Sequence, residues 1–331
     1  GNKLLVINAG NANAGTGLAG EKDLELLLNS LSSLTGVEIK NILPFSTGVI
    51  GERLKIKSLT SAFEECSKNL KKNNFNNLAT SIMTTDKKVK ISKKVVKIGN
   101  KKFSILGVAK GVGMIEPNMA TTLSFVFTDL KIAESSLKKI HKNICNETFN
   151  SISIDGDQSP SDSSILVATG KNLINSSKLL QTFKKSLEVV FTELSEKLLL
   201  DGEGATKLIE IEVSGLKSKT ACKEVAKKIA NSPLLKTAAY GEDPNWGRIL
   251  SAAGNTKHKF LAKNVSIKIG QIKVLNKGEI HKKYREALGK KEFKKQRISL
   301  AVNLGPSKHC AKVKSSDLTH EYVSINSDYR S

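Results

Sequence analysis

Residues 110–125 read KGVGMIEPNMATTLSF, and this stretch determines how the rest of the chain is interpreted. Glycine and proline in its first half permit unusual backbone angles and stiffen the approach. Residues 123–130 (LSFVFTDL) then predict a buried strand, with Thr121 and Thr122 at the boundary. Threonine is a weak nucleophile unless a base lies beside it. An N-terminal threonine carries such a base, because the pKa of an α-amine is about 7.7–8.0.

A cut between Ala120 and Thr121 would make threonine the first residue of a chain. The Thr121 hydroxyl would attack the Ala120 carbonyl while the glycine-rich approach holds the backbone under strain. Ala120 offers no bulk to block that attack. A loop that enters a strand with a chance Thr-Thr pair explains the same residues, and spacing alone favours this simpler interpretation.

The surrounding sequence predicts a mixed α/β protein without the regular alternation of a doubly wound sheet. Apolar residues at helical spacing predict helices near 21–34, 57–72, 134–149, 176–200 and 219–232. Strands are expected at 4–8, within 39–52, at 79–86, 123–130 and 207–215, with a hairpin around Gly99-Asn100 and further short strands after residue 264.

The net charge of +22 raises the hypothesis of a nucleic-acid partner. The lysines are scattered in pairs over the whole length, and aromatic residues make up only 5% of the chain, so few rings are present to stack on bases. A solvated lysine surface is therefore expected, with no nucleic-acid partner. No apolar run reaches the roughly 18 residues of a membrane span, so no membrane partner is expected.

The cysteines and histidines indicate neither disulfides nor a metal site. The four cysteines (66, 145, 222 and 310) form no CxxC pair, and we expect reduced, mostly buried thiols. The five histidines show no spacing typical of metal ligands. The first residues also lack a signal-peptide pattern. The sequence thus predicts a cytoplasmic protein without metal.

Two glycine motifs partly match patterns of phosphate or dinucleotide binding. Residues 15–20 (GTGLAG) match GxGxxG, the basis for an alternative as a nucleotide-binding oxidoreductase. The expected strand ends well before the first glycine, and no acidic residue follows the next strand to hold a ribose. Residues 202–207 (GEGATK) lack the full phosphate-loop pattern.

Long segments along the whole chain resemble the ornithine acetyltransferases, also called glutamate N-acetyltransferases, a family of arginine biosynthesis. Residues 110–129 resemble the segment at which this family cuts itself. The further segments, in the family's order, are 7–17 (INAGNANAGTG), 45–52 (FSTGVIGE), 155–170 (DGDQSPSDSSILVATG), 198–213 (LLLDGEGATKLIEIEV), 232–254 (SPLLKTAAYGEDPNWGRILSAAG) and 317–331 (DLTHEYVSINSDYRS).

The resemblance implies roles for individual residues. Thr121 is the expected nucleophile, freed by cleavage after Ala120 into chains 1–120 and 121–331 that fold together. Thr47 and Gly48 match the oxyanion hole of the family. The residues that match its substrate-binding positions are Thr84 or Thr85, Lys110, Thr121, Glu203, Asn326 and Ser331, where Ser331 replaces a threonine.

The resemblance also implies a fold, substrates and an assembly. The expected fold is a layered α/β sandwich with a mixed sheet, of the N-terminal-nucleophile-like type, and a smaller C-terminal α/β subdomain. The expected substrates are N2-acetylornithine and glutamate, with no cofactor; some members also take acetyl-CoA as a co-substrate. The expected assembly is a heterotetramer of two α and two β chains. A related N-terminal-nucleophile amidase or aminopeptidase, which passes the acyl group to water, is the alternative.

Overall fold

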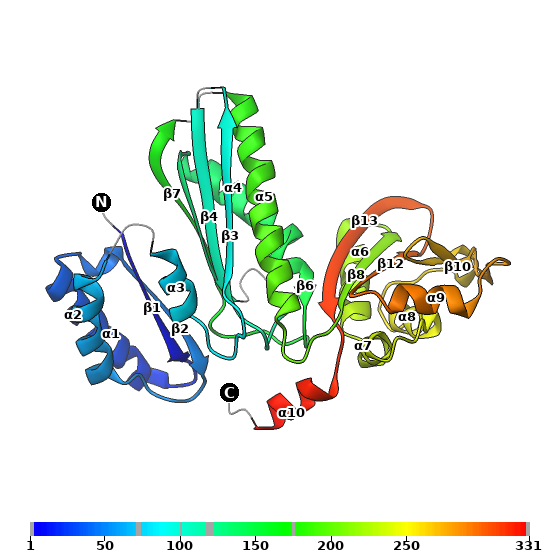
Figure 1. Ribbon diagram of the computed structural model, residues 1–331, viewed down its shortest axis with the longest axis horizontal. Coiled ribbons are helices and arrows are strands. Elements are labelled where there is room, and N and C mark those ends of the chain that lie inside the picture. Colours follow the sequence, from blue (N-terminus) through cyan, green and yellow to red (C-terminus); the bar gives the residue numbers. More distant parts are fainter. Residues whose placement is uncertain (1–2, 71–73, 100, 117–121, 174–175, 329–331) are drawn as a thin grey trace.

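The computed structural model describes residues 3–70, 74–99, 101–116, 122–173 and 176–328. Its strands form a two-stranded, a four-stranded and a seven-stranded sheet. Figure 1 shows the two-stranded sheet beside the upright four-stranded sheet, and the seven-stranded sheet on the other side of that central sheet. The predicted mixed α/β class is confirmed.

The N-terminal unit is a parallel strand pair with two long helices. Strands β1 (Leu4–Asn11) and β2 (Ile42–Val49) pair in register from Leu4 opposite Ile42. Helices α1 (Gly17–Thr35) and α2 (Ile56–Lys68) agree with the predicted helices, although α1 begins earlier, within the GTGLAG stretch. A short 3₁₀ turn, Ile39–Asn41, leads into β2.

The strand predicted at 79–86 is wrong. The chain instead forms α3 (Phe75–Ser81) followed by a turn. Leu78 and Ala79 of α3, together with Ile82 directly after it, belong to the same apolar cluster as Phe125 of the central sheet. A short apolar run such as this fits either a strand or a buried helix, and tertiary packing decides between them.

The central sheet has the order β3-β4-β5-β7, and α4 and α5 cover one of its faces (Figure 1). The predicted hairpin and the buried strand after Thr122 are both confirmed. Phe183, Leu187, Val190 and Leu194 of α5 are fully buried in this core. The bounds are β3 (Lys90–Ile98), β4 (Lys101–Lys110), β5 (Leu123–Lys131), β7 (Ser163–Leu173), α4 (Glu134–Glu147) and α5 (Ser177–Leu200).

The two segments on either side of the expected cut are neighbours in this central sheet. Strand β4 pairs antiparallel with β5, and Lys110 at the end of β4 lies opposite Leu123 at the start of β5. A cut within the intervening connection would therefore leave its two products joined by a ladder of backbone hydrogen bonds. The division into chains 1–120 and 121–331 remains a prediction.

The C-terminal sheet has the order β11-β10-β9-β12-β8-β13-β6, with α6 packed on strands β8 and β13. The short strands predicted after residue 264 are present, whereas α7, α8 and α9 lie in stretches where the sequence predicted no helix. The strands are β6 (Ile152–Ser153), β8 (Leu208–Gly215), β9 (Ser266–Ile269), β10 (Ile272–Asn276), β11 (Glu279–Ile280), β12 (Arg297–Asn303) and β13 (Ser307–Ser316). The helices are α6 (Lys219–Ala230), α7 (Pro233–Tyr240), α8 (Trp246–Gly254) and α9 (Glu286–Phe293), with 3₁₀ turns at Phe149–Ser151 and Ala262–Asn264.

The last helix, α10 (His320–Asp328), leaves the C-terminal unit and returns beneath the centre of the molecule. In Figure 1 it lies below the loops where the three units meet. This return brings the C-terminal end of the described chain toward the lower ends of the central strands. The fold therefore gathers segments that are far apart in sequence at one place.

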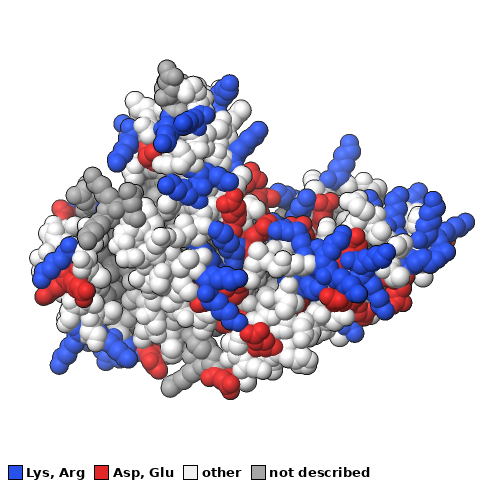
Figure 2. All heavy atoms as spheres, in the orientation of Figure 1, with Lys and Arg blue, Asp and Glu red and all other residues white. Residues whose placement is uncertain are grey.

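On the face shown in Figure 2, basic side chains are spread over two units and interspersed with carboxylates. The two units are the upright sheet and the C-terminal unit. Among the described residues, no helix is long and apolar enough to cross a membrane. All four cysteines are free, but only Cys145 and Cys222 are buried, so the expectation of mostly buried thiols is half correct.

Candidate active site

A cavity of about 250 Å³ lies where the three units meet. It collects side chains from the ends of β2 and β4, from the turn after α3, from the loops after β6 and α5, and from α10. Its lining consists of Thr47, Gly48, Ile50, Thr84, Thr85, Lys110, Gly113, Met114, Asp155, Asp157, Ser159, Glu203, Tyr322 and Asn326.

Lys110, the last residue of β4, supplies the buried positive charge of the cavity. Its side chain is only 7% exposed, and Nζ donates hydrogen bonds to Thr84 Oγ1 at 2.8 Å and to Thr47 Oγ1 at 3.1 Å. Within the described part of the chain, no carboxylate forms an ion pair with this ammonium. Burial lowers the pKa of Lys110, and the nearby carboxylate of Asp86 only partly offsets that effect. A buried cation without an anionic partner is suited to bind an anionic ligand.

Behind Lys110, a buried ion cluster holds the backbone in place. Lys90 Nζ lies 2.6 Å from Asp86 Oδ1 and 2.5 Å from Asp201 Oδ2. Asp86 Oδ1 also accepts the N–H of Gly111 at 2.8 Å, directly after Lys110. Although burial raises the pKa of Asp86, the charge of Lys90 and the Gly111 hydrogen bond hold it below its ordinary value. The cluster thus fixes the chain next to both site residues, at Gly111 directly after Lys110 and at Asp201 two residues before Glu203.

Glu203 supplies a buried carboxylate on another wall of the cavity, with an exposure of 8%. Thr85 Oγ1 donates to Oε1 at 3.0 Å, and Asn326 Nδ2 donates to Oε2 at 2.8 Å. A Cβ atom on Gly113 would lie 2.6 Å from Oε2, so a larger residue there would displace the carboxylate from this position. Glu203 is therefore held in one orientation by residues from distant parts of the chain.

Thr47 and Gly48 lie near the end of β2, beside Lys110. The Thr47 side chain is buried, and its hydroxyl oxygen accepts the Lys110 hydrogen bond. Gly48 has a φ of +130°, and a Cβ atom there would lie 2.3 Å from the carbonyl carbon of Gly10. Because Lys110 occupies a lone pair of the Thr47 oxygen, the hydroxyl proton remains available to a ligand.

The structure brings together every described residue that the sequence nominated for the site. Thr84 and Thr85 both face the cavity, so neither is preferred over the other. The others are Thr47, Gly48, Lys110, Glu203 and Asn326, whose roles remain predictions. Ala120, Thr121 and Ser331 lie outside the described residues.

Several residues of the cavity were not nominated. Asp155, Asp157 and Ser159 lie in a segment that the sequence resemblance included but did not assign. Tyr322 precedes Asn326 by one helical turn in α10, so the two side chains share a face. The Tyr322 hydroxyl donates to Asp155 Oδ2 at 3.4 Å, and burial raises the pKa of Tyr322. Tyr322 lies in the resembling segment 317–331, and its helical spacing from Asn326 was the further signal that pointed to it.

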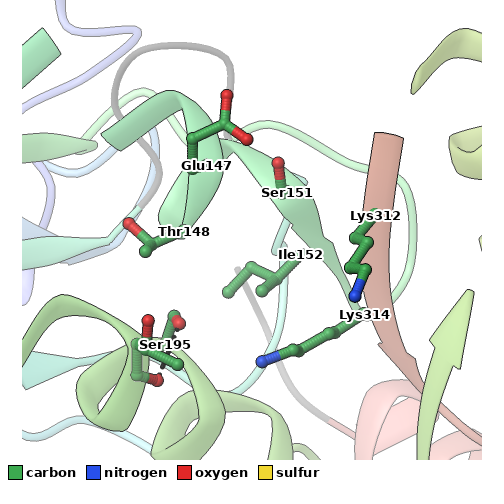
Figure 3. A pocket seen from close by; sticks show the side chains of 8 residues that line it. Glu147, Thr148, Ser151, Ile152, Ser195, Lys312 and Lys314 are labelled. Carbon is green, nitrogen blue, oxygen red and sulfur yellow. Dashed lines mark hydrogen bonds between the residues drawn. The ribbon is translucent and has the colours of Figure 1, made fainter. Parts of the chain in front are cut away.

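A second cavity, of about 30 Å³, lies between α4, α5 and β13. Figure 3 shows Lys314 extending from β13 toward Ser195 of α5. Lys314 Nζ lies 2.5 Å from Glu196 Oε1, so its charge is already paired. This space suits one or two water molecules rather than an amino acid. Among the described residues, no group of three or more His, Cys, Asp and Glu side chains is placed to hold a metal ion.

The whole chain is similar to known proteins of one family. Residues 2–331 match the family model described as the ArgJ family. A Pseudomonas fluorescens protein named arginine biosynthesis bifunctional protein ArgJ is 37% identical over 334 residues, which cover 99% of this chain and 82% of that protein. A Bradyrhizobium diazoefficiens protein of the same name is 40% identical, with the same two coverages. A crystal structure of the Bacillus halodurans protein of that name is 35% identical, has a TM-score of 0.57, and covers 61% of this chain and 96% of its own.

Proposed function

This chain belongs to the ArgJ family, and from that premise we propose that it is a glutamate N-acetyltransferase of arginine biosynthesis. It transfers the acetyl group of N2-acetylornithine to glutamate through an acetyl-threonine intermediate. The observation that supports this most is the single cavity that joins Lys110, Glu203 and Thr47, contributed by segments far apart in sequence. These residues match the charges of an amino acid and the needs of acyl transfer.

Activation begins with self-cleavage. The Thr121 hydroxyl oxygen attacks the Ala120 carbonyl carbon, and the C–N bond between the two residues breaks as the nitrogen takes up the hydroxyl proton. Water then hydrolyses the resulting ester, which leaves a carboxylate on Ala120 and both a hydroxyl and an α-amine on Thr121. The α-amine serves as the base for the transfer reaction because its pKa is about 7.7–8.0.

The transfer reaction follows in two halves. Thr121 Oγ1 attacks the acetyl carbonyl, its α-amine takes the hydroxyl proton and passes it to the departing α-amine of ornithine, and an acetyl ester remains. The α-amine of glutamate then attacks this ester, and its proton returns to Thr121 Oγ1. Thr47 and Gly48 stabilise the negative oxygen of each tetrahedral intermediate, an effect of roughly 3–4 kcal/mol per donor.

The geometry favours one orientation of the substrate. In N2-acetylornithine, the α-carboxylate lies close to the acetyl group, whereas the side-chain ammonium lies at the far end of the molecule. Lys110 is hydrogen-bonded to Thr47, the proposed oxyanion donor, so we assign the α-carboxylate to Lys110. Glu203 then lies toward the side-chain end and receives the ammonium of ornithine. Glutamate carries a carboxylate at this end, and it binds there by taking over the hydrogen bonds that Thr85 and Asn326 donate to Glu203 in the free protein.

An acetyl-transfer assay tests the proposal against the hydrolase alternative. Purified protein is incubated with N2-acetylornithine, with and without glutamate, and both N-acetylglutamate and free acetate are measured. We expect glutamate to accelerate loss of acetylornithine and to collect the acetyl group. Release of acetate at a rate independent of glutamate would instead identify an amidase.

The remaining parts of the proposal concern acetyl-CoA, assembly and location. We expect the cut chains to form a heterotetramer of two α and two β chains in the cytoplasm. The family resemblance supports this expectation, and sedimentation of the purified protein tests the assembly. Repeating the transfer assay with acetyl-CoA as donor determines whether the enzyme has the second activity.

A further inference from the structure

Residues 154–163 run from the end of β6 in the C-terminal sheet to Ser163, the first residue of β7 in the central sheet. This connection, here called the β6–β7 segment, hydrogen-bonds the described backbone on both sides of residues 117–121. It has no role in the transfer chemistry set out above. The inference drawn from it rests on the proposed self-cleavage.

On the downstream side, the β6–β7 segment holds both backbone polar groups of Thr122. Asp162 Oδ1 accepts the Thr122 N–H at 2.5 Å, and the Thr122 carbonyl accepts the N–H of Ser163 at 2.8 Å. Asp162 Oδ2 accepts the N–H of Ser159 at 2.9 Å, which fixes the plane of the carboxylate. The Thr122 N–H belongs to the planar peptide unit that Thr122 shares with Thr121. Asp162 therefore fixes the direction of the Thr122 N–H, the first described backbone group after the expected cleavage site.

Thr122 also has a strained backbone. Its φ of +128° is one that a β-branched residue rarely adopts, at a typical cost of about 1–3 kcal/mol. Such strain persists only where the surroundings enforce it. The two backbone hydrogen bonds from the β6–β7 segment provide that enforcement, directly after the expected cleavage site.

On the upstream side, the same segment holds consecutive residues. Asp155 accepts the N–H of Met114 on Oδ2 at 2.7 Å and that of Ile115 on Oδ1 at 2.8 Å. The N–H of Glu116 donates to the carbonyl of Asp157 at 2.7 Å. The upstream end is thus bonded to one half of the β6–β7 segment, and the downstream end to the other half.

The Glu116 side chain ties this upstream end to α6 as well. Lys227 Nζ lies 3.3 Å from Glu116 Oε1, and both Ser153 and Asn231 donate hydrogen bonds to Oε2. The upstream end is therefore anchored to the C-terminal unit by backbone and side chain together. After a cut at Ala120, these contacts would join two separate chains and keep the new end beside the cavity.

We propose that the β6–β7 segment is the template for self-cleavage and that Asp162 is its principal positioning residue. Both ends of the cleaved stretch are bonded to one short segment, so the distance between those ends is fixed before the reaction. Asp162 adds the fixed direction of the Thr122 N–H and maintains the strain at Thr122. This pre-organisation lowers the entropic cost of bringing the hydroxyl to the carbonyl, because the backbone is already held in place before the attack.

The test compares Asp162→Ala and Asp162→Asn with Ser161→Ala as a control in the same segment. In the described part of the chain, Ser161 forms a hydrogen bond only through its backbone N–H, to Ser159 Oγ. Intact mass is followed over time after purification. We expect Ser161→Ala to be cut at the wild-type rate and Asp162→Ala to be cut about ten- to a hundredfold more slowly, as for loss of a hydrogen bond to a charged acceptor. Asp162→Asn keeps one acceptor oxygen and should fall between them.

Thermal unfolding separates positioning from a purely structural role. Uncut Asp162→Ala should unfold only a few degrees below uncut Thr121→Ala, because two backbone hydrogen bonds to the carboxylate are lost; if Asp162→Ala does not fold, the rate of Asp162→Asn decides. Wild-type cutting of the Asp162 variants would overturn the inference. The inference would also be overturned if the Asp162 variants were cut slowly only at temperatures where they are partly unfolded. In that case their cutting rate would equal that of Ser161→Ala at lower temperatures, where all variants are folded. Normal cutting of Thr121→Ala would instead refute the proposed self-cleavage itself.

Discussion

Replacing Lys110 with methionine should separate substrate binding from folding. The change removes the charge that we assign to the α-carboxylate while keeping most of the side-chain volume. Lys110 is only 7% exposed, so its contact with a bound carboxylate is shielded from water. Removing one partner of a buried, hydrogen-bonded charge pair costs about 2–5 kcal/mol. The expected loss in kcat/KM for N2-acetylornithine is therefore about 30-fold to 5,000-fold.

The same change should not weaken the fold. Burial lowers the pKa of Lys110 below the ordinary value of 10.5, so at neutral pH the folded protein carries the full cost of burying the charged ammonium. That cost begins to fall as the pH rises through the lowered pKa and is gone only near the ordinary value of 10.5. Methionine removes it at every pH, and the thermal midpoint should be at least that of the wild type. Activity and stability would then change in opposite directions.

The assay is steady-state acetyl transfer across the alkaline range, alongside thermal unfolding. In the wild type, KM for N2-acetylornithine should rise as Lys110 loses its proton, and this alkaline limb should be absent from Lys110→Met. Lys87→Met is the control, because Lys87 pairs with Glu321 on the exposed surface, where such pairs contribute little. A folded Lys110→Met enzyme whose kcat/KM lies within about threefold of the wild type, under 1 kcal/mol, would refute the assignment.

Glu203→Gln should lower kcat/KM for N2-acetylornithine by about tenfold or more, with a smaller effect on glutamate, whereas Glu321→Gln on the surface should change neither; equal losses for both substrates in the transfer assay would contradict the orientation. Gly48→Ala should fail to accumulate as folded protein, because the new Cβ would lie 2.3 Å from Gly10 at a φ of +130°; a normal thermal midpoint would contradict this. Asp86→Asn should lower the free energy of unfolding by about 3–5 kcal/mol at neutral pH. Because the pKa of Asp86 is lowered in the folded state, that loss should shrink as the pH falls through this lowered pKa, and urea unfolding that shows a constant difference would argue against the ion cluster.

Local periodicity predicted the long elements and failed at the short ones. The apolar face of α5 and the Gly99-Asn100 hairpin were readable because each repeats its pattern over many residues. Helices α7 and α8 were missed because each spans little more than two turns. They begin at caps, Ser232 accepting from Leu235 and Asn245 from Arg248, within a stretch rich in proline and glycine.

Site residues were predictable only where they lie in a segment that resembles the family. Lys110, Glu203 and Asn326 were nominated through resemblance, and the fold places them on one cavity. The partnership of Lys90 with Asp201 spans 111 positions and has no local signal. Long-range pairing of this kind depends on how the sheets pack, which no window of sequence contains.

The most direct test of the central claim is intact-mass analysis of purified protein before and after brief exposure to N2-acetylornithine. We predict two fragments that meet between Ala120 and Thr121, and a fragment 121–331 that becomes heavier by one acetyl group, located on Thr121 by peptide mapping. Glutamate should remove that group. An uncut chain that nevertheless transfers acetyl, or an acetyl group on any other residue, would contradict the account.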